Sequence, residues 1–153
     1  LYKAIIGSGL HIPTKGCILF TVADKDKDEM KQLAKAFSDL GFELCATEGT
    51  ARAIASMGID VDIVGKVHER KSDIIEMIKT GKINMVINTL TQGKHSMNDG
   101  FRIRRATVEH GVACLTSLDT AWEVMRVLSF MRERRLVYSL ALQDYVGGGD
   151  DLA

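Results

Sequence analysis

Side chains that could bind a phosphate group stand at the end of an apolar run over residues 42–47. Thr47, Gly49 and Thr50 lie where that run stops and a helical pattern begins. The first backbone N–H groups of a helix have no partner within the helix, and its dipole adds partial positive charge there. Glycine lets the backbone approach a ligand, and threonine hydroxyls donate hydrogen bonds. These residues favour an anion site, although a helix capped by Thr50 after a turn relaxed by Gly49 would use the same residues.

Two lysines are placed to join this anion site. Lys27 follows the preceding apolar run, over residues 16–22, and Lys66 lies within an apolar stretch between Val64 and Val67. The carboxyl ends of parallel strands meet at one edge of a sheet, where ligands of α/β proteins bind. A solvated lysine in a first helical turn would also explain Lys27. Lys66 interrupts an apolar strand, which favours a functional role.

Polar residues after a fourth apolar run, over residues 83–89, would reach the same edge: Asn88, Thr89 and Thr91. A carboxamide suits a sugar or the edge of a base. Asn88 could instead form hydrogen bonds with the backbone of the adjacent strand, and the sequence does not favour either role over the other.

A basic cluster follows these polar residues. Lys94 and Arg102 could reach an anion at the same edge, whereas we expect Arg104 and Arg105 to lie on a solvated helix face. Clustered charges of this kind usually serve solvation.

Groups for proton transfer are sparse at this edge. The candidates are His68, Glu69, Asp73, His95 and Asp99. Arg70 and Lys71 add positive charge to the third loop, which favours the ionised, weakly basic form of a nearby carboxylate. The sequence shows no Ser-His-Asp or Cys-His arrangement, and we therefore predict no catalytic residue.

The composition indicates one soluble domain. Among 153 residues, 20 basic and 20 acidic side chains cancel, so no general charge favours nucleic acid or an anionic membrane. No apolar run is long enough to span a bilayer. Three dispersed cysteines, Cys17, Cys45 and Cys114, are typical of buried free thiols in a reducing cytoplasm, and no spacing suggests a metal site.

Five strand-helix units in succession predict a three-layer αβα sandwich around a parallel sheet, with right-handed crossovers. We predict strands over residues 16–22, 42–47, 61–67, 83–89 and 112–116. The four helices between them would begin at Asp26, Thr50, Ser72 and just after Gly100, and would end at Gly41, Gly58, Gly81 and Gly111.

The two ends of the chain are expected to lie outside this core. Residues 1–15 are predicted to connect to a preceding domain, residues 16–145 to form the domain itself, and residues 146–153 to form a flexible tail. The last helix, beginning at Ser117 or Asp119, should end at residues 132–135. Residues 137–145 alternate imperfectly, which predicts an added edge strand or a surface that packs against a neighbour.

Several short motifs in order resemble a known family. They are Val22-Ala23-Asp24-Lys25-Asp26-Lys27, Ala46-Thr47-Glu48-Gly49-Thr50-Ala51, Val64-Gly65-Lys66-Val67-His68-Glu69, Ile87-Asn88-Thr89 and Arg102-Ile103-Arg104-Arg105. Over essentially its whole length the chain resembles methylglyoxal-synthase-like domains, and within them the C-terminal allosteric domain of carbamoyl phosphate synthetase large subunits. The resemblance implies a five-stranded sheet of order 3-2-1-4-5.

The resemblance also implies roles for single residues. Lys27, Thr47, Thr50 and Lys66 match the family's phosphate and ribose contacts, and Asn88 and Thr89 match the pocket wall. Methylglyoxal synthases carry a catalytic aspartate in the loop after strand three, where this chain has Lys71. This departure implies a regulatory domain without its own catalysis, and a stand-alone lyase for a small phosphorylated sugar is the alternative.

The parent enzyme implied by the resemblance is a cytoplasmic, oligomeric synthetase. It would make carbamoyl phosphate from glutamine, bicarbonate and ATP, with magnesium or manganese, for pyrimidine and arginine biosynthesis. Its regulatory domain would bind UMP or a related nucleotide and need no cofactor. The partners would be the other domains of the large subunit and the small glutaminase subunit.

Overall fold

The computed structural model describes residues 11–65, 71–89 and 94–150, leaving aside the side chains of residues 71–73, 94–99, 137–139 and 143–150. Five short strands form one sheet: β1 (Cys17–Thr21), β2 (Glu43–Ala46), β3 (Asp62–Ile63), β4 (Met85–Asn88) and β5 (Ala113–Leu115). All strand pairs are parallel, and the order is β3-β2-β1-β4-β5. The predicted αβα fold, with sheet order 3-2-1-4-5, is confirmed.

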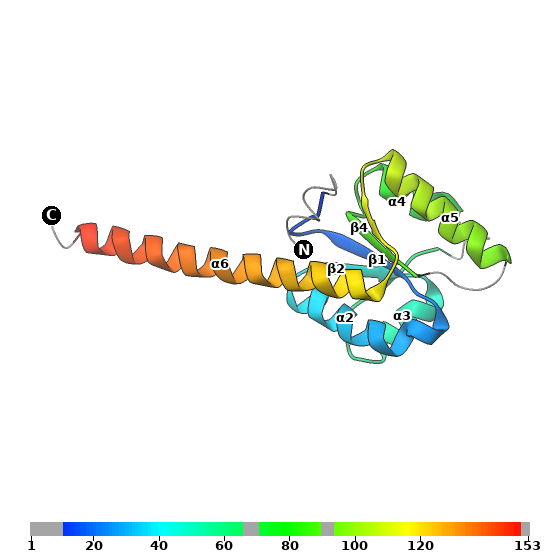
Figure 1. The fold of residues 1–153 in the computed structure, drawn as a ribbon, viewed down its shortest axis with the longest axis horizontal. Helices are drawn as coiled ribbons and strands as arrows, with labels where there is room; N and C mark the ends of the chain where they lie inside the picture. The colour runs from blue at the N-terminus through cyan, green and yellow to red at the C-terminus, as the bar shows by residue number, and fades with distance from the viewer. Residues whose placement is uncertain (1–10, 66–70, 90–93, 151–153) are drawn as a thin grey trace.

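Helices cover both faces of the sheet (Figure 1). They are the short 3-10 helix η1 (Asp24–Asp26) and the α-helices α2 (Lys27–Asp39), α3 (Glu48–Ala55), α4 (Lys71–Lys79), α5 (Lys94–Glu109) and α6 (Leu118–Asp150). Side chains of α2, α3 and α6 pack in the core on one face, and those of α4 and α5 pack in the core on the other. The sheet is therefore the middle of three layers.

Strand β1 shows how the sequence divides these two cores. Ile18 and Phe20 point to the side of α2, α3 and α6, whereas Leu19 points to the side of α4 and α5, and all three are fully buried. Successive side chains of a strand point to opposite faces, so a strand covered on both faces is apolar at every position. This is why the continuous apolar run over residues 16–22 correctly predicts a central strand.

Helices α2, α3, α4 and α5 end where the sequence indicates. Gly41 and Gly111 follow α2 and α5 with φ angles of +93° and +67°, a region that favours glycine. Two helix starts differ from the prediction by more than one residue, because α3 begins at Glu48 and α5 at Lys94. The Asn-Asp-Gly sequence before residue 101 favours a turn, yet it lies within α5.

Helix α6 is longer than predicted. It runs without a break to Asp150, so the predicted end at residues 132–135 and the edge strand over residues 137–145 are wrong. The helix also includes residues 146–150, where the sequence predicts a flexible tail. No glycine or proline interrupts residues 118–146, and that stretch is rich in leucine and arginine, which favour helix.

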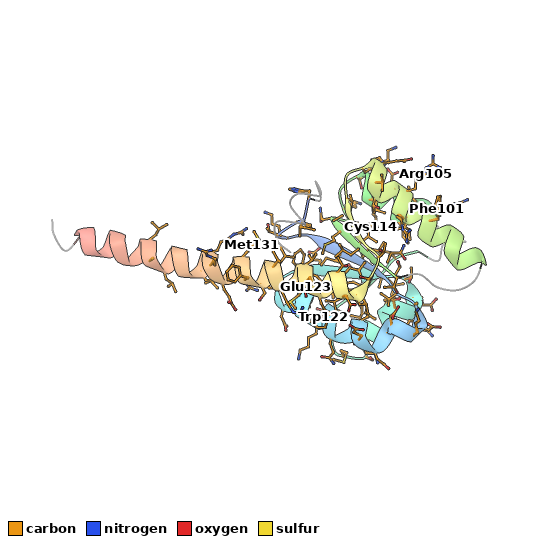
Figure 2. All side chains as sticks on the ribbon, in the orientation of Figure 1. Phe101, Arg105, Cys114, Trp122, Glu123 and Met131 are labelled. Carbon is orange, nitrogen blue, oxygen red and sulfur yellow. The ribbon has the colours of Figure 1, made fainter. Side chains whose placement is uncertain are left out.

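Only the first part of α6 packs on the domain. Leu118, Ala121, Val124 and Leu128 are buried in the core, and Arg132 Nη1 donates to the Asp39 carbonyl at 2.9 Å. Figure 2 shows Trp122 and Glu123 on the part of α6 beside the sheet and Met131 further along the helix. Beyond Arg132 the helix extends away from the body (Figure 1). Within the described residues, no helix is both long and apolar enough to cross a bilayer.

Candidate phosphate site

The carboxyl ends of β1, β2 and β4 lie next to one another because β1 stands between the other two strands. The chain leaves β1 toward β2 on one side, while β4 pairs on its other side. This reversal of strand order creates the place where open α/β sheets bind ligands. Most residues predicted to bind an anion follow these same three strands, whereas Lys66 comes after β3 in the sequence.

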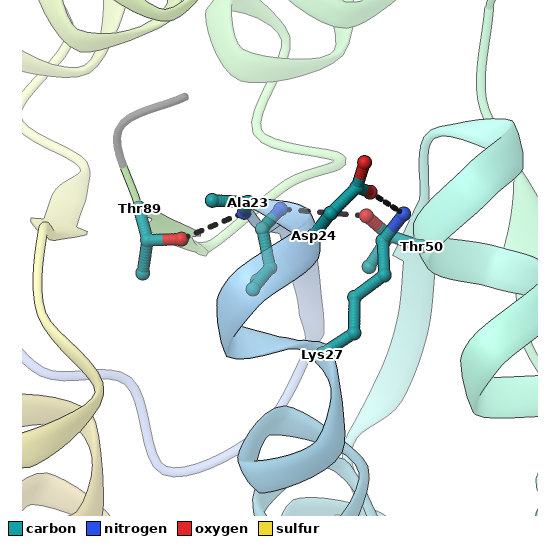
Figure 3. A network of polar contacts seen from close by, with 6 residues as sticks. Ala23, Asp24, Lys27, Thr50 and Thr89 are labelled. Atoms are coloured by element: carbon teal, nitrogen blue, oxygen red, sulfur yellow. Dashed lines mark hydrogen bonds and ion pairs between the residues drawn. The ribbon is translucent and has the colours of Figure 1, made fainter. Parts of the chain in front are cut away.

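Two buried threonine hydroxyls flank the end of β1 (Figure 3). The Val22 backbone N–H donates to Thr50 Oγ1 at 3.4 Å, and the Ala23 N–H donates to Thr89 Oγ1 at 2.9 Å. Thr50 and Thr89 are 2% and 6% exposed. A hydroxyl that accepts one bond still has a proton to donate. Within the described chain neither hydroxyl donates a hydrogen bond, so both can serve a further acceptor.

The ammonium group of Lys27 lies at the start of α3. A Cβ atom added to Gly49 would come within 3.1 Å of Lys27 Nζ, so the absence of a side chain at residue 49 leaves room for the lysine. The Lys27 side chain is 25% exposed and forms an ion pair with Asp24 of η1 (Figure 3). We call Lys27, Gly49, Thr50 and Thr89 the cradle.

Thr47, and not Thr50, is the N-cap of α3. Its backbone is extended, with φ −65° and ψ 159°, and its carbonyl accepts from the Ala51 N–H at 2.7 Å. Its side chain forms no capping hydrogen bond. Thr50 lies inside the first turn, where its hydroxyl faces β1 instead of the helix end. The first N–H groups of α3 are therefore not capped by Thr47, which suits an anion beside them.

Glu48, the acidic residue in the first turn of α3, forms an ion pair along its own helix. Arg52 Nη2 donates to Glu48 Oε1 at 2.7 Å, one helical turn further on. This pairing reduces the repulsion that Glu48 would exert on an anion at the first turn of α3.

Asn88 is engaged by its protein neighbours. Thr21 Oγ1 donates to Asn88 Oδ1 at 2.9 Å, and Asn88 Nδ2 donates to the Gly100 carbonyl at 3.2 Å. Asn88 is only 3% exposed. A Cβ at Gly100 would lie 3.4 Å from Asn88 Nδ2, so glycine allows this close packing within a helix. The carboxamide thus joins β4 to the Thr21 side chain of β1 and to α5, while a contact from Asn88 to a ligand stays a prediction.

The remaining predicted site residues either lie outside the described part of the chain or show no link to the cradle within it. Lys66, Thr91, His68 and Glu69 lie outside the described residues, as do the side chains of Lys94, His95, Asp73 and Asp99. Arg102 is exposed on α5, and no hydrogen bond or ion pair within the described ranges links it to the cradle.

The two neighbouring arginines differ. Arg105 is exposed and pairs with Glu109 at 3.1 Å, as expected for a solvated face, and Figure 2 shows it on α5 with Phe101. Arg104 is partly buried, and its buried Nε has no hydrogen-bond partner in the described structure, so this side chain is less solvated than predicted.

Two residues of this region are missed by the sequence analysis. Asp24 and Thr21 contact Lys27 and Asn88, respectively. The spacing of three residues between Asp24 and Lys27 is a signal that could have indicated their ion pair, because such residues are neighbours on a helical turn. Nothing in the sequence indicates the contact between Thr21 and Asn88, which lie 67 residues apart.

The cysteines lie on the α4 and α5 side of the sheet, away from the cradle. All three are free, as predicted, but only Cys45 is fully buried. The sulfurs of Cys17 and Cys45 lie 3.3 Å apart. Hydrogen bonding between them lowers the pKa of Cys17 and, with burial, raises the pKa of Cys45. In the part of the chain that the structure describes, no three His, Cys, Asp or Glu side chains gather as a metal site would require.

Comparisons with known proteins agree with this architecture. The crystal structure of methylglyoxal synthase from Elizabethkingia anophelis NUHP1 superposes with a TM-score of 0.60 at 19% identity, covering 74% of this chain and 79% of that chain. The crystal structure of ForH superposes with a TM-score of 0.51 at 21% identity, covering 75% and 80%. At these identities the two structures show a shared fold. A family model described as the MGS-like domain matches residues 29–116, more than half of the sequence. The chain therefore belongs to the family of MGS-like domains.

Proposed function

We propose that this chain is a regulatory domain that binds UMP, or a related nucleoside monophosphate, by its phosphate group at the cradle. The observation that carries this proposal is the placement of the Lys27 ammonium beside Gly49, with the Thr50 and Thr89 hydroxyls on either side of the end of β1. A phosphate accepts hydrogen bonds from ammonium, hydroxyl and N–H groups, and such charge-assisted bonds are the strong ones. The first turn of α3 adds its dipole.

The domain would act on a carbamoyl phosphate synthetase of which it forms a part. That enzyme would use glutamine, bicarbonate and ATP with magnesium or manganese, and its other domains and small glutaminase subunit would be the partners. Control would consist of a coupling free energy between two sites, typically about 1–3 kcal/mol. UMP can exert it only by contacting the active and inactive arrangements differently.

The regulatory assignment depends on Lys71, at the start of α4, where the resemblance places the catalytic aspartate of methylglyoxal synthases. A phosphate cradle alone would also suit a lyase that acts on a phosphorylated triose. Turnover of dihydroxyacetone phosphate decides between them. We expect none above background, and clear turnover that is lost in Lys27→Ala would establish the lyase instead.

Removing the Thr50 hydroxyl should weaken UMP binding. In Thr50→Val we expect the affinity to fall about tenfold, because a neutral donor to a charged phosphate oxygen is lost. Isothermal titration calorimetry on the native chain and the variant measures the change. Thr80→Val is the matched control, since Thr80 is exposed at the end of α4 and donates to the Glu76 carbonyl. Saturable UMP binding that is equally tight in Thr50→Val would contradict the placement of the phosphate.

A further inference from the structure

Asp24 is the negative partner of the cradle's only described ammonium group. Its carboxylate forms an ion pair with Lys27 Nζ one helical turn away. The Asp24 side chain is 93% exposed, whereas Lys27 is 25% exposed. The carboxylate therefore reaches Lys27 from the solvent, while the ammonium group also lies beside Gly49 at the start of α3.

Neighbouring acidic residues pair with other bases. Asp28 lies 3.6 Å from Lys31 on α2, and Glu48 pairs with Arg52 on α3. Among the ion pairs of the described residues, the pair with Asp24 is the one that includes Lys27. An exposed pair of this spacing contributes little to folding stability. The pair matters instead for binding, because it offsets part of the positive charge that the cradle would offer to an anion.

We propose that Asp24 is a built-in competitor of the phosphate. Its carboxylate pairs with Lys27 in the unliganded chain and thereby lowers the affinity of the cradle for an anion. This inference rests on the proposed function of the cradle. A bound phosphate either displaces the carboxylate from Lys27 or remains within a few ångströms of it and is repelled. Inorganic phosphate, which has only the phosphate contacts, then binds poorly, whereas a nucleotide has contacts from its sugar and base as well.

The test is Asp24→Asn, which keeps the size of the side chain and removes its charge. At constant ionic strength and at a pH where phosphate is a dianion, we expect inorganic phosphate to bind about 3- to 10-fold more tightly than to the native chain. Asp28→Asn is the control. It removes the same charge about one helical turn from Asp24, at a residue that pairs with Lys31 and not with Lys27. The control should change the affinity by less than about twofold, and an equal gain in both variants would overturn the proposal.

A double variant locates the effect at Lys27. Adding Asp24→Asn to Lys27→Ala should give no gain in phosphate affinity over Lys27→Ala alone, because the charge that Asp24 neutralises is absent. A full gain in the double variant would overturn the proposal. So would an Asp24→Asn single variant that binds phosphate as weakly as the native chain, or more weakly.

The ion pair can also be measured without any ligand. Hydrogen bonding and charge from Lys27 hold the pKa of Asp24 below its usual range. Lys27→Ala should raise this pKa toward the value of a free aspartate, as followed by the carbon resonance of the carboxyl group. An unchanged titration would overturn the pairing itself.

Titration of UMP separates the two proposals. If UMP binds in a Lys27-dependent way but Asp24→Asn does not tighten phosphate binding, only the role of Asp24 fails. If UMP does not bind but phosphate binds more tightly to Asp24→Asn, the nucleotide function fails and the role of Asp24 stands.

Discussion

Lys27→Ala is expected to weaken the binding of UMP about 30-fold, or about 2 kcal/mol, because charge-assisted hydrogen bonds to phosphate are among the strong polar contacts. Lys27 holds the ammonium group that reaches Gly49 at the first turn of α3. Part of the lysine charge is already cancelled by Asp24, which keeps the expected loss below that of an unpaired buried lysine. Calorimetric titration of UMP into the native chain and the variant measures the difference.

Lys31→Ala provides the control for this prediction. Lys31 lies on the same helix, its side chain is 30% exposed, and it pairs with Asp28 instead of a cradle residue. The control should bind UMP as the native chain does. Equal losses of UMP affinity in Lys27→Ala and Lys31→Ala would indicate general attraction by positive charge. An undiminished affinity in Lys27→Ala would show that Lys27 does not contribute to the UMP site.

Asn88→Ala should lower the free energy of unfolding by about 3 kcal/mol, because it removes two hydrogen bonds at a buried position and opens a cavity. The partners are the Thr21 hydroxyl and the Gly100 carbonyl. Urea-induced unfolding measures the loss. An effect below about 1 kcal/mol would show that water replaces the carboxamide at little cost.

Thr21→Val tests the hydrogen bond on which part of the structural role of Asn88 depends. It removes only the hydroxyl that donates to Asn88, at an expected cost of about 1 kcal/mol. In a double-mutant cycle, Thr21→Val and Asn88→Ala should be coupled, since the two side chains share one hydrogen bond. Additive effects would contradict the bond.

The sheet could be predicted from the sequence because its signals are local. Central strands covered on both faces must be apolar at every position, and this is visible in the runs around Leu19 and Val86. The helix ends could be predicted for a similar reason, since Gly41 and Gly111 adopt backbone angles that other residues avoid.

Element boundaries depend on contacts that the sequence does not display. The start of α3 differs from the prediction because Thr50 has the features of a cap, yet its hydroxyl accepts from Val22, just after β1. Gly100 favours a turn by itself, but it lies in α5 where Asn88 packs closely against the helix. The end of α6 was misplaced because the alternation over residues 137–145 resembles a strand, although nothing there interrupts a helix.

The candidate site could be predicted in part. The rule that ligands bind at the carboxyl ends of parallel strands selects eight residues, and the structure brings four of them together, Lys27, Gly49, Thr50 and Thr89. The pairing of Lys27 with Asp24 was missed, although their spacing of three residues makes them neighbours on a helical turn.

The location of bound UMP tests the central claim most directly. We would titrate UMP into the isotope-labelled chain and follow the backbone amide resonances. The largest shifts should belong to Val22, Ala23, Gly49, Thr50 and Thr89, should saturate together, and should be much smaller with uridine, which lacks the phosphate. Saturable shifts centred on the exposed face of α5, or equal shifts with uridine, would contradict phosphate recognition at the cradle.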